Sequence, residues 1–312
     1  MQYLPSSTDF RRQRAIACIA LATFGLSILV VAVSAYLRLL GAGLGCSDWP
    51  GCYGSLLAGV PHAPWEGARL FHRVVATAAL LAGIALVWRT LRPQLLQPAG
   101  RYAILLLALM LFLSIVGVWS ADPRHALVNF INLVGGLGLV TFSWRVVITA
   151  MPRSVETQST DGPMLRTGLA MLTATVLLGA LIGARYAAPA CGTVPDCQGI
   201  WWPTGGSWSV LHPFATLSGP AGKGEGGGVL LHLLHRYFAV AAAGLLAAAA
   251  WRAWRVPQAR PAATMVLLFL GLEIALGVLT VASGFKLWLA VGHNVGAALL
   301  LAAAASLLRR AR

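Results

Sequence analysis

Eight long apolar runs dominate the sequence, and they constrain the fold more than any other feature. Each is long enough to cross a bilayer, because a spanning helix needs about 20 predominantly apolar residues. Only 10% of the 312 residues are charged and 58% are hydrophobic, whereas a soluble domain has about 25% charged residues. The sequence therefore predicts an all-α membrane protein with spans at 15–37, 70–88, 102–121, 126–148, 165–187, 229–251, 262–283 and 288–308.

The arginines set the expected orientation of these spans. They precede the first run, follow the even-numbered runs and close the chain: Arg11, Arg12, Arg14, Arg89, Arg92, Arg101, Arg145, Arg153, Arg166, Arg252, Arg255, Arg260, Arg309, Arg310 and Arg312. In an eight-span chain these positions share one side, and an excess of Lys and Arg marks the cytoplasmic side. Both termini are therefore expected in the cytoplasm. The net charge of +14 then reflects topology, and basic residues scattered over short loops argue against a nucleic-acid partner.

Four of the five cysteines form two pairs, in the motifs GCSDWPGC and ACGTVPDC. Both pairs fall outside the cytoplasm in the eight-span arrangement, in an oxidising space where disulfides persist. We expect disulfides between Cys46 and Cys52 and between Cys191 and Cys197. Free thiols or a metal site are the alternatives, although metal sites usually space cysteines by two to four residues. Cys18, within the first run, is expected to be a small packing residue.

The two cysteine motifs also indicate an internal repeat. Each is followed by a span that begins with a His-Arg pair, in FHRVVA for the first and LHRYFA for the second. Two halves with the same topology are the simplest explanation of this recurrence. The sequence predicts two repeated four-helix bundles, at residues 1–150 and 151–312.

Three of the four histidines within the predicted spans are candidate ligands, because ionisable residues are costly there and call for an explanation. They are His72, His235 and His293. The last two lie roughly 10 Å below the outer ends of their helices, and equal depth in one half suits two axial ligands of a haem. Hydrogen bonding to a neighbouring helix is the alternative for each of them. His232 lies near the same helix face as His235, and is a rival ligand or a partner of a haem propionate.

Other charged side chains near these histidines have two interpretations each. Arg73 and Arg236 could pair with haem propionates, or extend to the interface with no ligand. Glu273, an acidic residue inside an apolar run, could relay protons or form a hydrogen bond across helices while neutral.

The outer loops carry residues to which we assign no cofactor. His62 and His212 are expected at the surface, whereas His125 lies at the mouth of the fourth span and remains ambiguous. An aromatic belt at the interface explains Trp201, Trp202 and Trp208.

Taken together, these motifs resemble the heme A synthase family. The resemblance is carried by RLLGAGLGCSDWPGCYG, the two His-Arg pairs, GVWS, LGVLTV and the second cysteine loop, and covers about residues 20–305. It implies an eight-span protein with two similar halves in the inner (plasma) membrane of a bacterium. It also implies an oxidoreductase that converts the C8 methyl of haem O to the formyl group of haem A, for insertion into terminal oxidases.

The same resemblance implies site residues and partners. His235 and His293 would ligate haem b in the carboxyl half, and His72 would be one of the two ligands of the substrate haem O in the amino half. The first cysteine pair would support the catalytic half. The expected partners are haem O, the farnesyltransferase that produces it, an electron donor and membrane lipid, and oligomerisation is possible.

The chain departs from the family pattern at two positions of the amino half. Asn132 in NLVGGL stands where the family has the second histidine, and asparagine is not an ordinary haem ligand. Arg69 stands where the family has a glutamate three residues before the first His-Arg pair. Glu66, six residues before His72, lies on a different helix face.

Two classes of function therefore remain open from the sequence. The first is an active heme A synthase whose substrate haem binds at His72 with an open or otherwise filled position. The second is a non-catalytic haem-binding membrane protein, for electron transfer or haem handling, that retains the carboxyl-half site alone.

Overall fold

The computed structural model describes residues 7–42, 44, 63–96, 98–122, 125–150, 162–202, 207–212 and 226–310. Within these ranges the chain is all-helical and contains no strand. The long helices are α1 (Ser7–Leu39), α3 (Pro64–Leu91), α4 (Ala99–Val116), α5 (Ala126–Ala150), α6 (Gly162–Ala184), α7 (Gly226–Trp254), α8 (Arg260–Ala282) and α9 (Leu287–Arg310). Three short 3₁₀ segments accompany them: η1 (Gly117–Ala121), η2 (Ala188–Ala190) and η3 (Ser207–Leu211).

The prediction of eight spans is confirmed, since eight helices are long and apolar enough to cross a membrane. The largest difference from the predicted boundaries is at α1, which begins at Ser7 instead of residue 15. Arg11, Arg12 and Arg14 end the apolar run without ending the helix. Arginine is a good helix former, and its long stem lets the charge reach water beside apolar surface.

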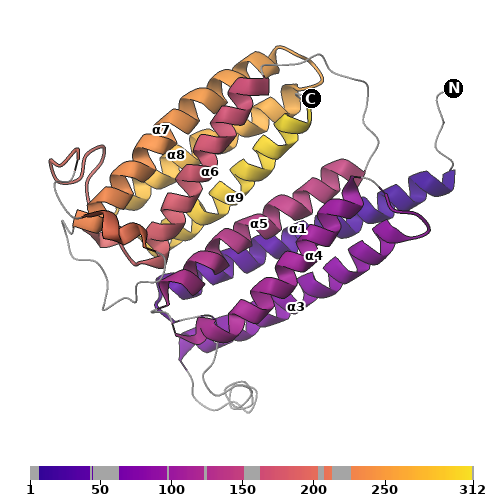
Figure 1. Ribbon diagram of the computed structural model, residues 1–312, viewed down its shortest axis with the longest axis horizontal. Helices are drawn as coiled ribbons and strands as arrows, with labels where there is room; N and C mark the ends of the chain where they lie inside the picture. The colour runs from indigo at the N-terminus through magenta and orange to yellow at the C-terminus, as the bar shows by residue number, and fades with distance from the viewer. Residues whose placement is uncertain are drawn as a thin grey trace.

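The helices pack in two groups of four that lie side by side (Figure 1). α1, α3, α4 and α5 form the first group, and α6, α7, α8 and α9 form the second. In each group consecutive helices are neighbours and the fourth helix returns to the first. The division into two halves at residue 150 and the internal repeat both stay predictions.

Small side chains bring the two groups together through α1, α5 and α9. A buried cluster at this junction contains Val31 from α1, Val140 from α5 and Ala298 from α9. A Cβ added to Gly136 of α5 would lie 3.2 Å from Val31 Cγ2, so α1 and α5 approach closely where glycine permits it. Such small-residue contacts are typical of packed membrane helices, where the hydrophobic effect does not drive association.

The end of α1 has a geometry that fixes the direction of its last turn. Gly41 has a φ of +67°, and the Ala42 amide donates to the Leu37 carbonyl at 3.0 Å. This is the Schellman pattern, in which glycine takes the left-handed conformation without the strain that a Cβ would bring. The turn leaves Arg38 in the last turn of α1 with a buried side chain.

The second cysteine prediction is confirmed and the first lies outside the described residues. Cys191 and Cys197 form a disulfide with an S–S distance of 2.05 Å, whereas Cys46 and Cys52 belong to a segment that the structure does not describe. The packing role predicted for Cys18 is wrong, because its side chain is exposed on the outside of α1. The span itself was assigned correctly, but the rotation of the helix was not.

Candidate functional site

His235 and His293 lie together between α7 and α9, as their equal predicted depth required. Their ring centroids are 6.4 Å apart and the ring planes are inclined at 85°. Two imidazoles that bind one metal ion from opposite sides have centroids roughly 6 Å apart, because each metal–nitrogen bond is about 2 Å long. The observed separation therefore fits a pair of axial ligands.

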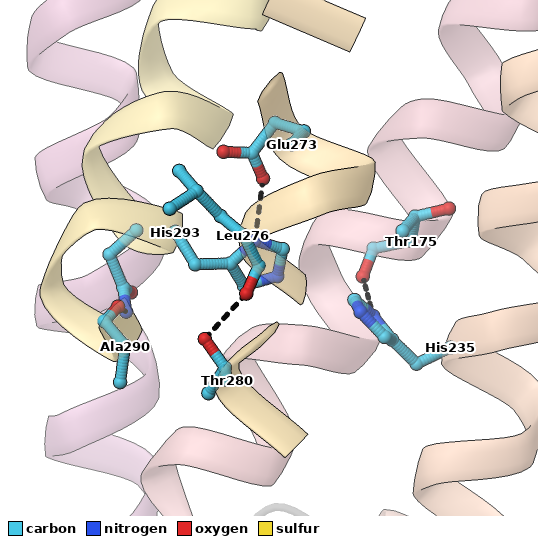
Figure 2. Close-up of polar contacts among 8 residues, drawn as sticks. Thr175, His235, Glu273, Leu276, Thr280, Ala290 and His293 are labelled. Atoms are coloured by element: carbon cyan, nitrogen blue, oxygen red, sulfur yellow. Dashed lines mark hydrogen bonds and ion pairs between the residues drawn. The ribbon is translucent and has the colours of Figure 1, made fainter. Parts of the chain in front are cut away.

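The Nδ1 atom of each histidine has a fixed partner on a neighbouring helix (Figure 2). His235 Nδ1 lies 2.8 Å from the Thr175 carbonyl oxygen of α6, and His293 Nδ1 lies 2.8 Å from Glu273 Oε2 of α8. An Nδ1–H that donates to oxygen leaves the lone pair on Nε2, which is the arrangement of most metal-bound histidines. The Thr175 carbonyl oxygen can only accept, so His235 donates from Nδ1 and keeps the Nε2 lone pair for a ligand. An Nδ1–H of His293 that faces Glu273 would leave its Nε2 in the same state.

Glycines make room for these three side chains. A Cβ added to Gly179 would lie 3.0 Å from His235 Cε1, and one added to Gly277 would lie 3.2 Å from His293 Cε1. A Cβ added to Gly296 would lie 1.9 Å from Glu273 Oε1, a distance that no packing allows. Glycine at residue 296 is therefore a condition for the buried carboxylate to occupy its place.

Glu273 contacts a neighbouring helix, with Oε2 at ion-pair distance from His293 Nδ1, while its two predicted roles, a proton relay and a neutral hydrogen bond, stay predictions. The carboxyl group is buried and joins α8 to α9 through His293. The sequence placed an acid in the span but did not identify its partner. Matching depths of Glu273 and His293 were the available signal, and depth does not reveal which way a helix is rotated.

His232 does not join His293, although it is one turn from His235. Its side chain is buried, and its Nε2 lies 3.2 Å from the Ala187 carbonyl oxygen beside η2. Its ring is 6.3 Å from that of Phe285. This geometry separates His232 from the His235–His293 pair and places it in the packing of the N-terminal part of α7.

Arg236 holds the disulfide loop against the N-terminal part of α7. Its Nη1 donates to the carbonyl oxygens of Pro195 at 3.0 Å and Asp196 at 2.6 Å. Its Nη2 is buried and has no hydrogen-bond partner within the described ranges. One edge of the guanidinium is thus anchored, and the other remains able to bind an anion.

A cavity of about 540 Å³ lies within the amino-half group. Its volume is in the range of sites that hold small molecules and cofactors. His72 from α3 and Asn132 from α5 both line it, together with Arg38 and Arg73. Most of the remaining wall is apolar: Val30, Val31, Ala35, Ala76, Leu80, Met110, Leu113, Leu133 and Leu139.

Asn132 occupies in α5 the register that His293 occupies in α9. Each is six residues past the first residue of its helix. The Nδ2 atom of Asn132 is buried and has no hydrogen-bond partner among the residues described. The amino-half cavity thus presents one imidazole, and an amide that could hydrogen-bond a ligand stands at the second position.

Arg69 and Glu66 do not line this cavity. The Arg69 guanidinium donates to the Ala42 carbonyl oxygen just after the end of α1. Glu66 lies in the first turn of α3, where an acidic side chain is favoured by the helix dipole. Arg69, at the position where the family pattern has glutamate, therefore connects α3 to the end of α1.

The residues to which we assigned no cofactor lie at the periphery. His125 is exposed, with its Nε2 3.8 Å from Asp122 Oδ2, and His212 is exposed while its carbonyl accepts from Arg185. Burial lowers the pKa of that arginine. His62 lies outside the described residues. The three outer tryptophans are exposed, as an interfacial belt requires: Trp201, Trp202 and Trp208.

Two residues of the cavity wall were missed by sequence reasoning. Arg38 entered only as the first residue of the motif RLLGAGLGCSDWPGCYG, without a role, and Asn294 was not singled out at all. Asn294 follows His293 directly and reaches the amino-half cavity from α9. Only the packing of α9 against α1 and α5 brings it there, and no local pattern encodes that contact.

Comparison with known proteins gives consistent relatives. The family of cytochrome oxidase assembly proteins termed COX15-CtaA matches residues 17–69 and 124–305. A heme A synthase of Shewanella oneidensis is 27% identical over 308 residues, which cover 89% of this chain and 91% of that protein. A heme A synthase of Rhizorhabdus wittichii is 30% identical over 253 residues, covering 77% and 69%.

A protein named protoheme IX farnesyltransferase, from Thermus thermophilus, is also similar. It is 26% identical over 283 residues, which cover 86% of this chain but only 43% of that protein. The family match spans both halves and includes Arg38, His235, Glu273 and His293. The chain belongs to the heme A synthase family of cytochrome oxidase assembly proteins.

Proposed function

We propose that the protein is a membrane heme A synthase that oxidises the C8 methyl of haem O to a formyl group, for the assembly of terminal oxidases. Membership of the family supports the reaction class. One observation carries the assignment to this chain. The molecule contains two separate histidine sites, of which one pairs two imidazoles and the other is a cavity with one imidazole and an apolar wall.

The carboxyl-half pair is the proposed site of haem b. His235 and His293 would hold it, and the donor set fits because each Nδ1 lies 2.8 Å from an oxygen atom, which leaves Nε2 for the metal. Bis-histidine ligation is typical of haems that transfer electrons rather than bind substrates. Arg236, with its free buried Nη2, would bind a propionate there.

The amino-half cavity is the proposed site of haem O. His72 would hold the macrocycle, and Arg73 would bind a propionate. The four-electron oxidation of the methyl group needs an external oxidant, which the haem iron would activate when bound. The chain supplies position and exclusion of water, through the apolar side chains of the cavity wall. Asn132 cannot donate an imidazole, so His72 would be the imidazole of the described lining that holds the haem here.

The proposed orientation follows from the arginines and from the two sites. Both termini would be cytoplasmic, in the inner membrane of a bacterium, with the Cys191–Cys197 disulfide outside. The histidine sites draw on the late turns of α1 and α4 and the early turns of α3, α5, α7 and α9. Since neighbouring helices alternate in direction, both sites would lie toward the outer surface.

The proposed partners follow from the reaction. Haem O must be supplied by an enzyme that attaches a farnesyl chain to protohaem, and one relative of this chain carries the name of such an enzyme. An electron donor is required for reuse of the haem b site, and membrane lipid surrounds the exposed apolar side chains, such as Leu81, Val118 and Val240.

A second candidate function is a haem-binding membrane protein without catalysis. Asn132 is the observation that favours it, because the amino-half cavity then lacks the second ligand of the family pattern. Such a protein would keep haem b on His235 and His293 and would serve electron transfer or haem handling.

Production of haem A separates the two candidates. The chain should be co-expressed with a source of haem O, and the extracted haems should be resolved by chromatography and mass spectrometry. We expect haem A with the unmodified chain, and its loss with His72→Ala while the haem b spectrum is retained. A protein that shows the haem b spectrum but yields no haem A would be the non-catalytic candidate.

A further inference from the structure

Arg38 is a buried cation in the wall of the amino-half cavity. It lies in the last turn of α1, its side chain is 7% exposed, and it lines the same cavity as His72 and Asn132. A charged group removed from water is costly unless an opposite charge or several hydrogen bonds compensate it. The surroundings of Arg38 therefore indicate whether its charge is satisfied within the chain.

The compensation that the described residues offer to Arg38 is small. A guanidinium has five N–H donors, and the acceptor recorded for Arg38 is Asn294 Oδ1, 3.5 Å from Nη2. That distance is at the outer limit of a hydrogen bond. No carboxylate of the described chain pairs with Arg38. The described residues therefore leave most of its donor capacity unused.

Neighbouring helices nevertheless hold the guanidinium in position. Asn294 Nδ2 donates to the Ala290 carbonyl oxygen of its own helix at 2.8 Å, which turns Oδ1 toward Arg38. On the opposite side, a Cβ added to Gly183 of α6 would lie 2.7 Å from Arg38 Nη1. Arg38 is thus seated between α9 and α6 and is poorly neutralised there.

The cavity as a whole is suited to an anion. Its described lining includes two arginines, Arg38 and Arg73, and no acidic residue. Arginine binds carboxylates through two parallel hydrogen bonds, and such charge-assisted bonds are stronger than neutral ones. A ligand with an extended apolar body and at least one carboxylate matches both the wall and its charges.

We propose that Arg38, oriented by Asn294, binds a carboxylate of the porphyrin that occupies the amino-half cavity and thereby fixes how the macrocycle lies against His72. This inference rests on the proposed function, because it requires a porphyrin in that cavity. The end of α1 would then contact the ligand through Arg38. The orienting residue Asn294 would come from α9, the helix that also carries His293.

The test compares ferric protoporphyrin IX with its dimethyl ester, in which both carboxylates are neutral. Purified full-length protein with the carboxyl-half haem in place is titrated with each compound, and the amino-half signal is the part that His72→Ala removes. In the unmodified protein we expect the diacid to bind roughly 10- to 100-fold more tightly than the ester, as for hydrogen bonds to charged groups. Absence of this preference would overturn the proposal without any variant.

Arg38→Gln should then weaken binding of the diacid by roughly 10- to 100-fold and leave binding of the ester nearly unchanged. Arg38→Lys, which keeps the charge but loses the two-pronged geometry, should have an intermediate preference. Arg185→Gln is the matched control, since Arg185 is also a buried arginine just past a helix end but does not line the cavity. It should retain the full preference for the diacid.

Two results would overturn the proposal and leave the proposed function standing. One is equal weakening of diacid and ester by Arg38→Gln, which would make Arg38 a structural tie between α1 and α9. The other is unchanged binding of both compounds. An unmodified protein that binds no second porphyrin would overturn the proposal and the assigned role of the amino half together.

Discussion

The two groups of four helices have the same order of neighbouring helices, but the side chains at corresponding positions differ. In the carboxyl half, Glu273 packs over Gly296 and holds His293. In the amino half, a Cβ added to Gly135 would lie 2.5 Å from Leu113 Cδ2. Gly135 and Gly296 are each nine residues past the first residue of their helix, so Leu113 stands where the other half has a carboxylate.

This difference indicates how one arrangement of helices can serve two purposes. In the carboxyl half, the Glu273 carboxylate holds the His293 imidazole in place, and this geometry suits permanent ligation. Asparagine and leucine at the matching positions leave the amino half with an apolar cavity and one imidazole. We infer that the carboxyl half would retain its cofactor, whereas the amino half would exchange its ligand.

The largest expected effect is the loss of the carboxyl-half haem. His235→Ala or His293→Ala should remove the low-spin absorption of the purified protein almost completely, because one axial ligand is lost. Absorption spectroscopy of the reduced protein measures this. His232→Ala is the matched control and should retain the spectrum, since Nε2 of His232 faces Ala187. The reverse outcome for the two α7 histidines would exchange their roles.

A change of spin state is expected when the amino half receives a second imidazole. Asn132→His should convert the amino-half haem from high-spin to low-spin, because the new ring would face the cavity that His72 also lines. Magnetic circular dichroism of the ferric protein checks this conversion. If the variant behaves like the unmodified protein, either the amino half binds no haem or residue 132 does not face it.

A smaller effect is expected from filling the space over Glu273. Gly296→Ala places a Cβ 1.9 Å from Glu273 Oε1, so the carboxylate must move and release His293. Loss of such a partner typically weakens metal binding by about 10- to 100-fold. The rate of haem transfer to apomyoglobin measures the weakening.

Gly292→Ala in the same helix is the control for that substitution. Its added Cβ would meet Leu276 at 3.6 Å, which is ordinary contact, so haem retention should be unchanged. If the Gly296→Ala and Gly292→Ala variants retain haem equally well, the present position of Glu273 is not required for haem retention.

The smallest expected effect is electrostatic. Glu273→Gln preserves an oxygen acceptor for His293 but removes a carboxylate beside a haem ligand. A less negative surrounding favours the reduced haem, so the midpoint potential should rise by roughly 50 mV, about a tenfold change for a one-electron couple. Spectroelectrochemical titration measures it, and a fall in potential would contradict the assigned contact.

Much of the fold could be predicted from the sequence, because membrane spans are encoded locally. Apolar length identified all eight helices, and the arginine at the end of the first span was visible. The start of α1 was misplaced by eight residues, since Arg11, Arg12 and Arg14 interrupt hydropathy but not the helix. The outward face of Cys18 was missed because apolar runs facing lipid and protein look alike.

The candidate sites were predictable in part. Depth along the helix predicted that His235 and His293 would meet, and the family pattern directed attention to Asn132. The partners of these residues were not predictable, since they depend on helix rotation and on contacts between halves. Glu273 with His293, and Arg38 with Asn294, are examples in which 20 or more residues separate the two members.

Electron paramagnetic resonance of the ferric protein loaded with haem O tests the central claim most directly. The account predicts two distinct signals in the unmodified protein: a low-spin signal from the haem on His235 and His293, and a high-spin signal from the haem at His72. Two low-spin bis-histidine signals would contradict this claim, because a second histidine besides His72 would then have to ligate the haem of the amino half.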